Sequence, residues 1–176
     1  MTASTETGAH PARQPTTGGP LLEVKDLVKH FPIRSSGLVR RTIGQVQAVD
    51  GISFSVDSGE ALGLVGESGC GKSTTGRLIT RLYEPTSGEM HFDGQDLATL
   101  SSKQMLPVRR DVQMIFQDPY SSLNPRHTVG SIISTPLRTH KVVDKKGLLP
   151  RVQELLELVG LNPEHYNRYP SEFSGG

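Results

Sequence analysis

Apolar and polar positions alternate in short segments over residues 21–56. Residues 22–24 and 46–49 are short apolar runs of the kind found in strands, and residues 52–56 alternate as a half-buried strand does. Residues 32–45 carry three arginines together with glycines and serines, which predicts a surface loop with solvated charges. This part of the chain therefore predicts short strands joined by loops.

Two continuous apolar runs predict buried strands of a parallel sheet. Residues 61–65 read ALGLV and follow a turn at 57–59, and residues 111–117 read DVQMIFQ. Runs without alternation are typical of strands that are covered on both faces. Because the carboxyl ends of parallel strands face the ligand crevice in open α/β sheets, we expect Gln117 and Asp118 to meet a bound ligand.

Later segments predict a hairpin and two helices. Residues 89–92 indicate a brief strand that Asp93-Gly94 closes as a hairpin turn. Residues 128–137 and 144–159 have helical spacing, and Gly160 ends the second helix. The apolar residues of that helix recur every three or four positions, which indicates a packing face and no chemistry.

The composition describes an ordinary chain with room for about one domain. It has 176 residues, of which 34% are hydrophobic and 21% charged, and no apolar run approaches the ~18 residues of a membrane span. The net charge of +1 gives no argument for binding nucleic acid or a membrane surface. The single cysteine excludes a disulfide framework and favours a reducing compartment. Residues 1–20 lack the apolar core of a signal peptide and predict a disordered tail.

The strongest motif follows the first apolar run. Residues 66–73 read GESGCGKS, which fits the pattern G-x-x-x-x-G-K-S, and a helix-compatible stretch comes next. Glycines let successive backbone N–H groups converge on one anion, and the N terminus of a helix favours the same anion. We expect Lys72 to neutralise the β- and γ-phosphates of a triphosphate and the Ser73 hydroxyl to bind Mg²⁺. A plain glycine-rich turn between a strand and a helix is the alternative.

Several residues have competing interpretations. Phe31 can be a core residue, which spacing alone favours, or it can stack on a nucleotide base. Asp118 can hold Mg²⁺ at the end of an apolar strand, but it begins the turn-rich stretch DPYSSLNPR, which suits a loop. We therefore prefer Gln117 as the residue that contacts Mg²⁺ or the attacking water. Cys70 fills a variable position of the motif and is interpreted as a bystander.

Three motifs in this order resemble the ATP-binding subunits of ABC transporters: GESGCGKST at 66–74, MIFQDPYSSLNPR at 114–126 and YPSEFSGG at 169–176. More narrowly, they are similar to the oligopeptide and dipeptide importer ATPases, and the similarity covers about residues 21–176. The resemblance implies an α/β fold of the P-loop NTPase type. Such a fold has an antiparallel β subdomain, a RecA-like core and a helical subdomain.

The resemblance also implies a division and a set of site residues. The core and β subdomain would take about residues 21–118, and the Q-loop with the start of the helical subdomain about 117–176. Lys72 and Gln117 would be the catalytic residues, Gln117 being the Q-loop residue that links the nucleotide to the membrane subunits, and Ser73 and Gln117 would hold the metal. Three groups of residues would bind ATP. The A-loop aromatic would stack on the base, the Walker A motif would hold the phosphates, and the signature would cap the γ-phosphate of ATP held by the opposite subunit. In that order they are Phe31, then Gly66, Glu67, Ser68, Gly69, Cys70, Gly71, Lys72, Ser73 and Thr74, and then Ser174, Gly175 and Gly176.

The chain also departs from the family pattern. The Walker B Asp, the catalytic Glu and the switch His that follow the signature in the family are absent from this sequence. We therefore expect that the C-terminal half of the core is missing and that an apolar sheet edge beside the P-loop strand is uncovered, which favours aggregation. We also expect this chain alone not to hydrolyse ATP.

The leading hypothesis is the ATP-binding subunit of a peptide importer at the cytoplasmic face of the membrane. It would use ATP and Mg²⁺ and work with membrane permeases, a second ATP-binding subunit and, indirectly, an extracytoplasmic substrate-binding protein, but with no nucleic acid. A soluble P-loop kinase or GTPase is a second hypothesis, although the sequence has no guanine-reading N-K-x-D segment and no basic lid after Gln117. A truncated nucleotide-binding fragment without hydrolytic activity is the third.

Overall fold

A computed structural model describes residues 18–35, 41–118 and 122–173. Most of the predicted tail at 1–20 and the signature residues Ser174, Gly175 and Gly176 lie outside these residues. The chain divides into two compact units, Met1–Met105 and Leu106–Gly176, and each is treated by itself below.

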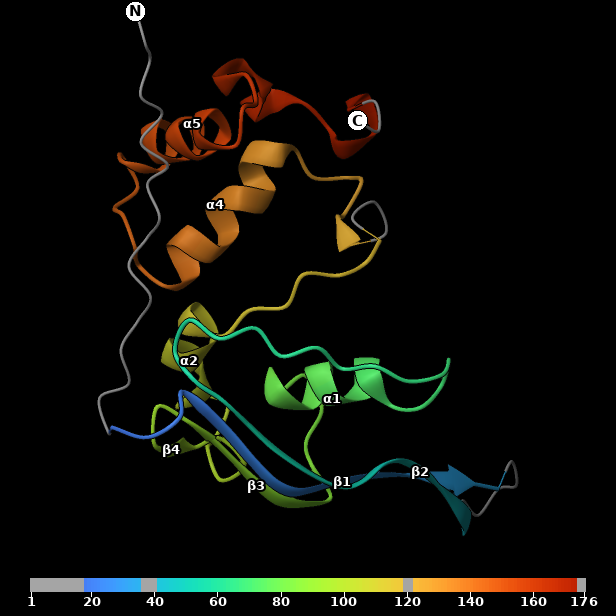
Figure 1. Cartoon of the computed structure of the whole chain (residues 1–176). Helices are drawn as coiled ribbons and strands as arrows, with labels where there is room; N and C mark the ends of the chain where they lie inside the picture. The colour runs from blue at the N-terminus through green and yellow to red at the C-terminus, as the bar shows by residue number, and fades with distance from the viewer. Residues whose placement is uncertain (1–17, 36–40, 119–121, 174–176) are drawn as a thin grey trace, which may run out of the picture. The chain divides into compact units, whose positions relative to one another are not determined.

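The first unit is built on an antiparallel sheet whose strand order is β2-β1-β3-β4. Its elements are β1 (Leu22–Arg34), β2 (Thr42–Val56), α1 (Lys72–Ile79), β3 (Ser87–Phe92) and β4 (Gln95–Asp96), and α2 (Met105–Asp111) begins at its last residue (Figure 1). The buried apolar side chains of this unit are Val24, Leu27, Val49, Leu78, Met90, Leu97 and Met105. The core of the unit therefore lies where α1 and the chain after β4 cover the sheet.

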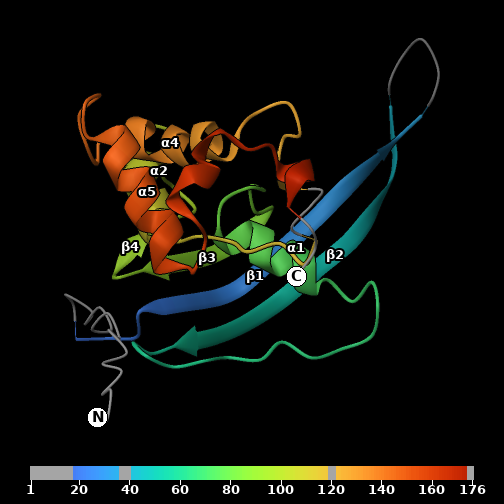
Figure 2. The same ribbon diagram turned by 90° about the horizontal axis from the view of Figure 1, so that it is seen from above.

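The predicted strands at 22–24, 46–49 and 52–56 are confirmed, but they belong to two long strands. β1 and β2 pair as far as Arg34 opposite Thr42, so the predicted loop at 32–45 is too long at both ends. β1 has no partner in β3 beyond Val28. From there β1 and β2 continue as a two-stranded ribbon (Figure 2). The exposed arginines suit such a ribbon because both of its faces meet solvent.

The hairpin between β3 and β4 is confirmed at its predicted turn. Asp93 and Gly94 both have positive φ, 51° and 77°, as the two central residues of a type I′ turn require. The turn at 57–59 is also present, with the Glu60 amide donating to the Asp57 carbonyl at 3.1 Å. These local predictions succeed because the turn geometry is set by the turn residues themselves.

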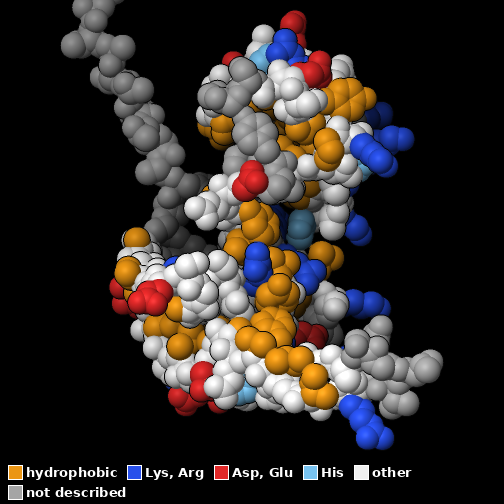
Figure 3. Space-filling model, turned by 90° about the vertical axis from the view of Figure 1, so that its right-hand side faces the viewer, with side chains coloured by type: hydrophobic (Ala, Val, Ile, Leu, Met, Phe, Trp, Pro, Cys, Tyr) orange, Lys and Arg blue, Asp and Glu red, His pale blue; other side chains and the backbone are white. Residues whose placement is uncertain are grey.

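The two buried strands predicted at 61–65 and 111–117 are wrong for this structure. Neither run is a strand, and Val65 and Ile115 are 97% and 96% exposed. A strand of a parallel sheet needs hydrogen-bonded neighbours, and no strand of the described residues pairs with either run. The expected uncovered sheet edge is therefore not formed, although apolar side chains do reach the surface (Figure 3).

The second unit is helical. Its elements after α2 are α4 (Val129–Thr139), α5 (Leu148–Leu158) and the 3₁₀ turns η1 (Pro163–Asn167) and η2 (Pro170–Glu172). The predicted helix at 128–137 is confirmed, with Thr128 as N-cap accepting from the Ser131 amide at 3.3 Å. No helix among the described residues combines the length and the apolar character that a bilayer crossing requires.

The helix predicted at 144–159 is also confirmed, but it begins four residues later than expected. Asp144 and Gly147 form a turn in which the Gly147 amide donates to Asp144 Oδ1 at 2.8 Å, and the helix starts after it. The predicted packing face is confirmed at Val152 and Leu156, which are 0% and 1% exposed, but not at Leu149 and Val159, which are 47% and 68% exposed. Gly160, at φ 79°, ends the helix as predicted.

Candidate functional site

The side chain of Lys72, the first residue of α1, folds back over the glycine-rich loop that precedes it. Its Nζ donates to the carbonyl oxygens of Gly66 at 2.7 Å and Glu67 at 2.6 Å, and it lies 3.4 Å from Cys70 Sγ. The loop therefore curves around an ammonium group, which brings a positive charge to the position where the motif predicts phosphate.

The second half of the loop depends on glycine. Gly71 has φ 95°, and a Cβ atom there would collide with the carbonyl oxygen of Ala48 in β2. Gly69 also has a positive φ of 84°, but it has open space where its Cβ would be. Gly71 thus allows the loop to pack directly on β2, and both glycines provide backbone angles that other residues adopt with strain.

The N terminus of α1 is open to an anion. No side chain caps it, and no acidic residue occupies its first turn. The Thr75 amide and hydroxyl both bond the Gly71 carbonyl, at 2.8 and 3.1 Å, which anchors the first turn to the loop. Ser73 is exposed in this turn, as are Glu67 and Ser68 in the loop, so the amides of the turn and the Ser73 hydroxyl can face a ligand.

Phe31 lies in β1 close to this loop. It pairs with Val46 in β2, two residues from the Ala48 carbonyl that contacts Gly71. Its ring is half-buried and meets the ring of Tyr83 edge to face, with 5.4 Å between centroids and 81° between planes. Phe31 is therefore not in the closed core that spacing alone favoured, and its ring is partly exposed on β1.

Two further predicted residues, Gln117 and Asp118, lie outside the unit that contains the loop. Gln117 and Asp118 are exposed and belong to the second unit, whereas Lys72 and Ser73 belong to the first. The roles of Gln117 in catalysis and metal binding therefore stay predictions. Within the described ranges, no group of three or more His, Cys, Asp or Glu residues could hold a metal ion.

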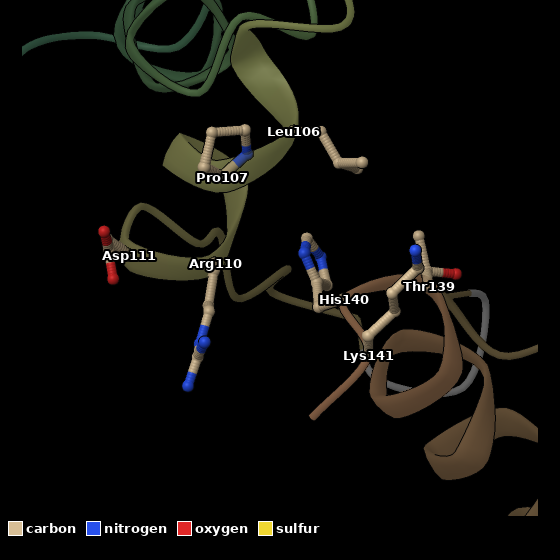
Figure 4. A pocket seen from close by; sticks show the side chains of 7 residues that line it. All are labelled: Leu106, Pro107, Arg110, Asp111, Thr139, His140 and Lys141. Atoms are coloured by element: carbon tan, nitrogen blue, oxygen red, sulfur yellow. The ribbon is translucent and has the colours of Figure 1, made fainter. Parts of the chain in front are cut away.

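A hollow in the second unit lies between α2 and the end of α4 (Figure 4). Its volume is about 490 Å³, and its lining includes Leu106, Arg110, Thr139, His140 and Lys141. The Arg110 and His140 side chains point in different directions and do not converge on one position (Figure 4). None of the residues predicted to bind ATP or metal lines it, so we do not assign it to the nucleotide.

A loop of this shape between β2 and a helix N terminus defines a P-loop nucleotide-binding protein. The family model described as ABC transporter matches residues 49–176, which is most of the chain. The chain therefore belongs to the ABC transporter family, as the three sequence motifs indicated.

The curated relatives are named as ATP-binding proteins of transport or import. The oligopeptide transport ATP-binding protein AppF of Bacillus subtilis (strain 168) is 54% identical over 157 residues, which are 89% of this chain and 47% of AppF. The glutathione import ATP-binding protein GsiA of Salmonella typhimurium is 55% identical over 159 residues, or 90% of this chain and 25% of GsiA. The chain thus spans half or less of the length of these two relatives.

Solved structures confirm the fold class. The dimeric post-hydrolysis state of the ATP-binding cassette MJ0796 with ADP and Pi matches with a TM-score of 0.70 at 23% identity, over 87% of this chain and 63% of that one. A second dimeric structure of MJ0796 also matches with a TM-score of 0.70, at 24% identity. The predicted α/β fold of the ABC type is therefore correct, although the two parallel strands predicted within it are not formed here.

The sequence did not predict the contacts of two residues, Ala48 and Tyr83. Ala48 contacts the loop through its backbone carbonyl, which any residue would supply. Tyr83 meets Phe31 only through the fold, because 52 positions separate them and no motif links them. The one sequence feature that could have suggested this contact is that Tyr83 is an aromatic residue shortly after the helix that follows the glycine-rich loop.

Proposed function

We propose that this chain is the nucleotide-binding part of an ABC importer for peptides, in which ATP binding and hydrolysis drive transport. The observation that carries the proposal is the Lys72 ammonium group held at 2.7 and 2.6 Å by the Gly66 and Glu67 carbonyls inside the glycine-rich loop. The names of AppF and GsiA, which mention oligopeptide transport and glutathione import, support the substrate class.

In this proposal the loop binds the phosphates of ATP. The Lys72 ammonium exchanges the two carbonyls for the β- and γ-phosphate oxygens, because a charged acceptor forms the stronger hydrogen bond. The uncapped first turn of α1 donates backbone N–H groups to the same phosphates, and the helix dipole adds to the attraction. These groups position the phosphates and stabilise the charge that develops during phosphoryl transfer.

The donor set fits Mg²⁺. Ser73 presents an exposed hydroxyl oxygen beside the phosphate position, and hard cations of this kind prefer oxygen ligands shared with substrate phosphates. Bound there, the ion would supply neutralisation of phosphate charge. Gln117 is the second proposed ligand, and it also orients the attacking water.

The whole importer would place this chain at the cytoplasmic face of the membrane. It would contact membrane permeases, pair with a second ATP-binding subunit and receive substrate through an external binding protein. The signature residues Ser174, Gly175 and Gly176 would cap the γ-phosphate of the ATP held by that second subunit. The dimeric MJ0796 cassettes support the pairing at the level of the fold.

A second candidate is nucleotide binding without turnover by this chain alone. The strand that was predicted to place Gln117 is not formed, and Ile115 within it is 96% exposed. A residue that positions water must be held rigidly. The loop around Lys72, in contrast, is formed, because Lys72 bonds carbonyls within the loop and the strand on which Gly71 packs, β2, is present.

Binding of a fluorescent ATP analogue with Mg²⁺ to the full chain tests the proposal. We expect saturable binding that Lys72→Ala abolishes, because the loop then loses its cation. Lys103→Ala is the matched control, since Lys103 is an exposed lysine outside the loop. Binding that is equal in the wild type and Lys72→Ala would overturn the proposal, and phosphate release above the Lys72→Ala rate would separate hydrolysis from binding alone.

A further inference from the structure

The turn after α1 holds the part of β1 that carries Phe31. The Thr86 amide donates to the Val28 carbonyl at 2.8 Å, and the His30 amide donates to Thr86 Oγ1 at 3.0 Å. Lys29 Nζ donates to the Glu84 carbonyl at 2.7 Å. Together with a longer bond from the Thr86 hydroxyl to the His30 carbonyl at 3.5 Å, these hydrogen bonds join the turn to β1 at and just beyond Val28, its last residue paired with β3. The turn therefore takes the place of the strand neighbour that β1 lacks there.

Two side chains, Tyr83 from the turn after α1 and Lys29 from β1, fix the orientation of the Phe31 ring. Tyr83 meets it edge to face at 5.4 Å, and Lys29 Nζ lies 4.9 Å from its centroid. The edge-to-face arrangement is the favourable one for two aromatic rings, and an ammonium over a ring is attracted by its π electrons. The half-buried Phe31 ring therefore has two side-chain neighbours that restrict its rotation.

Tyr83 is in turn connected to the phosphate-binding loop through α1. Its amide donates to the Arg77 carbonyl at 3.1 Å, and the Arg77 guanidinium lies 5.8 Å from the centre of its ring. Arg77 belongs to α1, whose first residue is Lys72. The aromatic ring beside the loop and the loop itself are thus held by the two ends of one short helix.

We propose that Tyr83 is a positioning residue for the base of the bound nucleotide, acting through the Phe31 ring. The inference rests on the proposed ATP-binding function and extends it to a residue outside the sequence motifs. A base stacks only on a ring whose plane is fixed, and Tyr83 fixes this plane while Lys72 receives the phosphates. Tyr83 itself does not contact the base.

Competition against the fluorescent ATP analogue tests this role, with two competitors measured on each variant of the full chain. ATP carries a base, whereas inorganic triphosphate carries only the phosphates. We expect Phe31→Ala to weaken ATP binding about tenfold and Tyr83→Leu about two- to tenfold. Triphosphate binding should change less than twofold in both variants, because the loop around Lys72 is not altered.

Two further variants separate positioning from general stability. Tyr83→Phe keeps the ring and should bind ATP like the wild type, and Leu82→Ala should do the same because Leu82 is 52% exposed next to Tyr83. The double variant Phe31→Ala/Tyr83→Leu should be no weaker than Phe31→Ala alone, since Tyr83 acts only through Phe31.

The outcomes distinguish the two proposals. If the wild type binds neither competitor in a Lys72-dependent way, the proposed function itself fails. If Phe31→Ala weakens ATP binding but Tyr83→Leu does not, the function stands and the role of Tyr83 is refuted. If Tyr83→Leu weakens ATP and triphosphate equally, Tyr83 supports the fold of the loop and not the base, which also refutes this inference.

Discussion

Gly130, in the first turn of α4, lies flat against the ring of Tyr166 in η1, so closely that a Cβ atom at position 130 would be 2.6 Å from two ring carbons. Contacts of this length do not occur between real side chains, so any larger residue must displace the ring. The absence of a side chain at Gly130 is therefore a packing requirement of the helical unit.

We predict that Gly130→Ala destabilises the second unit by about 1–3 kcal/mol, because the added methyl group overpacks a buried position. Thermal or denaturant unfolding followed by circular dichroism measures the change. Replacing Tyr166 by Leu in the Gly130→Ala background should recover part of the loss, which a double-mutant cycle would show as a favourable coupling. Additive effects of the two substitutions would contradict this explanation.

Gly71 and Gly69 should respond differently to alanine. Both have positive φ, and such strain costs about 1 kcal/mol or more in a residue with a side chain. Only Gly71→Ala also places a Cβ against the Ala48 carbonyl, so it should lower stability and the affinity for ATP more than Gly69→Ala does. Gly63→Ala, at a position with open space and no positive φ, is the control. Equal losses at Gly69 and Gly71 would show that the contact with Ala48 is unimportant.

Thr128 should contribute to the stability of α4 as its N-cap. Thr128→Ala removes the acceptor of the Ser131 amide and should cost about 1 kcal/mol, measured by unfolding. Thr128→Ser retains the hydroxyl and should behave like the wild type. Thr135→Ala serves as a control because Thr135 is exposed and its hydroxyl bonds only the Ser131 carbonyl within the same helix. A loss as large at Thr135 as at Thr128 would contradict the capping role.

The ion pair of Lys25 with Glu23, 2.9 Å from Nζ to Oε1, should stabilise the fold at neutral pH and lose this effect at high pH. The hydrogen bond from Lys25 to Glu23 is the largest cause and raises the pKa of Lys25 above its ordinary value of 10.5. Desolvation opposes it, and the negative charges of Glu23 and Glu89 raise the pKa further. The pKa of Lys25 is higher in the folded state than in the unfolded state. The ion pair therefore contributes to the free energy of unfolding below pH 10.5, and this contribution is lost as the pH rises through the folded-state pKa.

Titration of the Lys25 side chain by NMR checks this prediction. Glu23→Gln should lower the pKa of Lys25, since it removes both the charged acceptor and a nearby negative charge. Glu89→Gln should lower it less, because Glu89 makes no hydrogen bond with Lys25 that contributes to the shift. An unchanged titration in Glu23→Gln would refute the assignment.

The features that could be predicted from the sequence are those that neighbouring residues determine. The Asp93-Gly94 turn, the helix predicted at 128–137 and the glycine-rich loop around Lys72 all formed where the pattern placed them, because each is set largely by residues near it in sequence. The extent of β1 and β2 was underestimated for the opposite reason. Pairing across the hairpin continues through residues such as Arg34, whose side chain type suggested a loop.

Whether the two apolar runs, residues 61–65 and 111–117, are buried could not be predicted from the sequence. Val65 and Ile115 lie in sequences typical of buried strands, and both are almost fully exposed. The apolar pattern indicates that a segment can form a buried strand. Whether it is buried depends on pairing with strands from distant parts of the chain or the assembly. The contact of Phe31 with Tyr83 has the same origin, since it depends on how the turn after α1 meets β1.

The change of neighbours along β1 also has a consequence for local opening. Val24 lies between β2 and β3, whereas Ile33 pairs with β2 alone. Amide hydrogens near Val24 should therefore exchange with solvent only through large-scale unfolding, and those near Ile33 through fraying of the ribbon end. Phe31 stands at the border between these two regimes, where the Lys29–Glu84 bond limits how far the fraying can travel. The turn after α1 thus limits the opening motion that reaches the Phe31 ring.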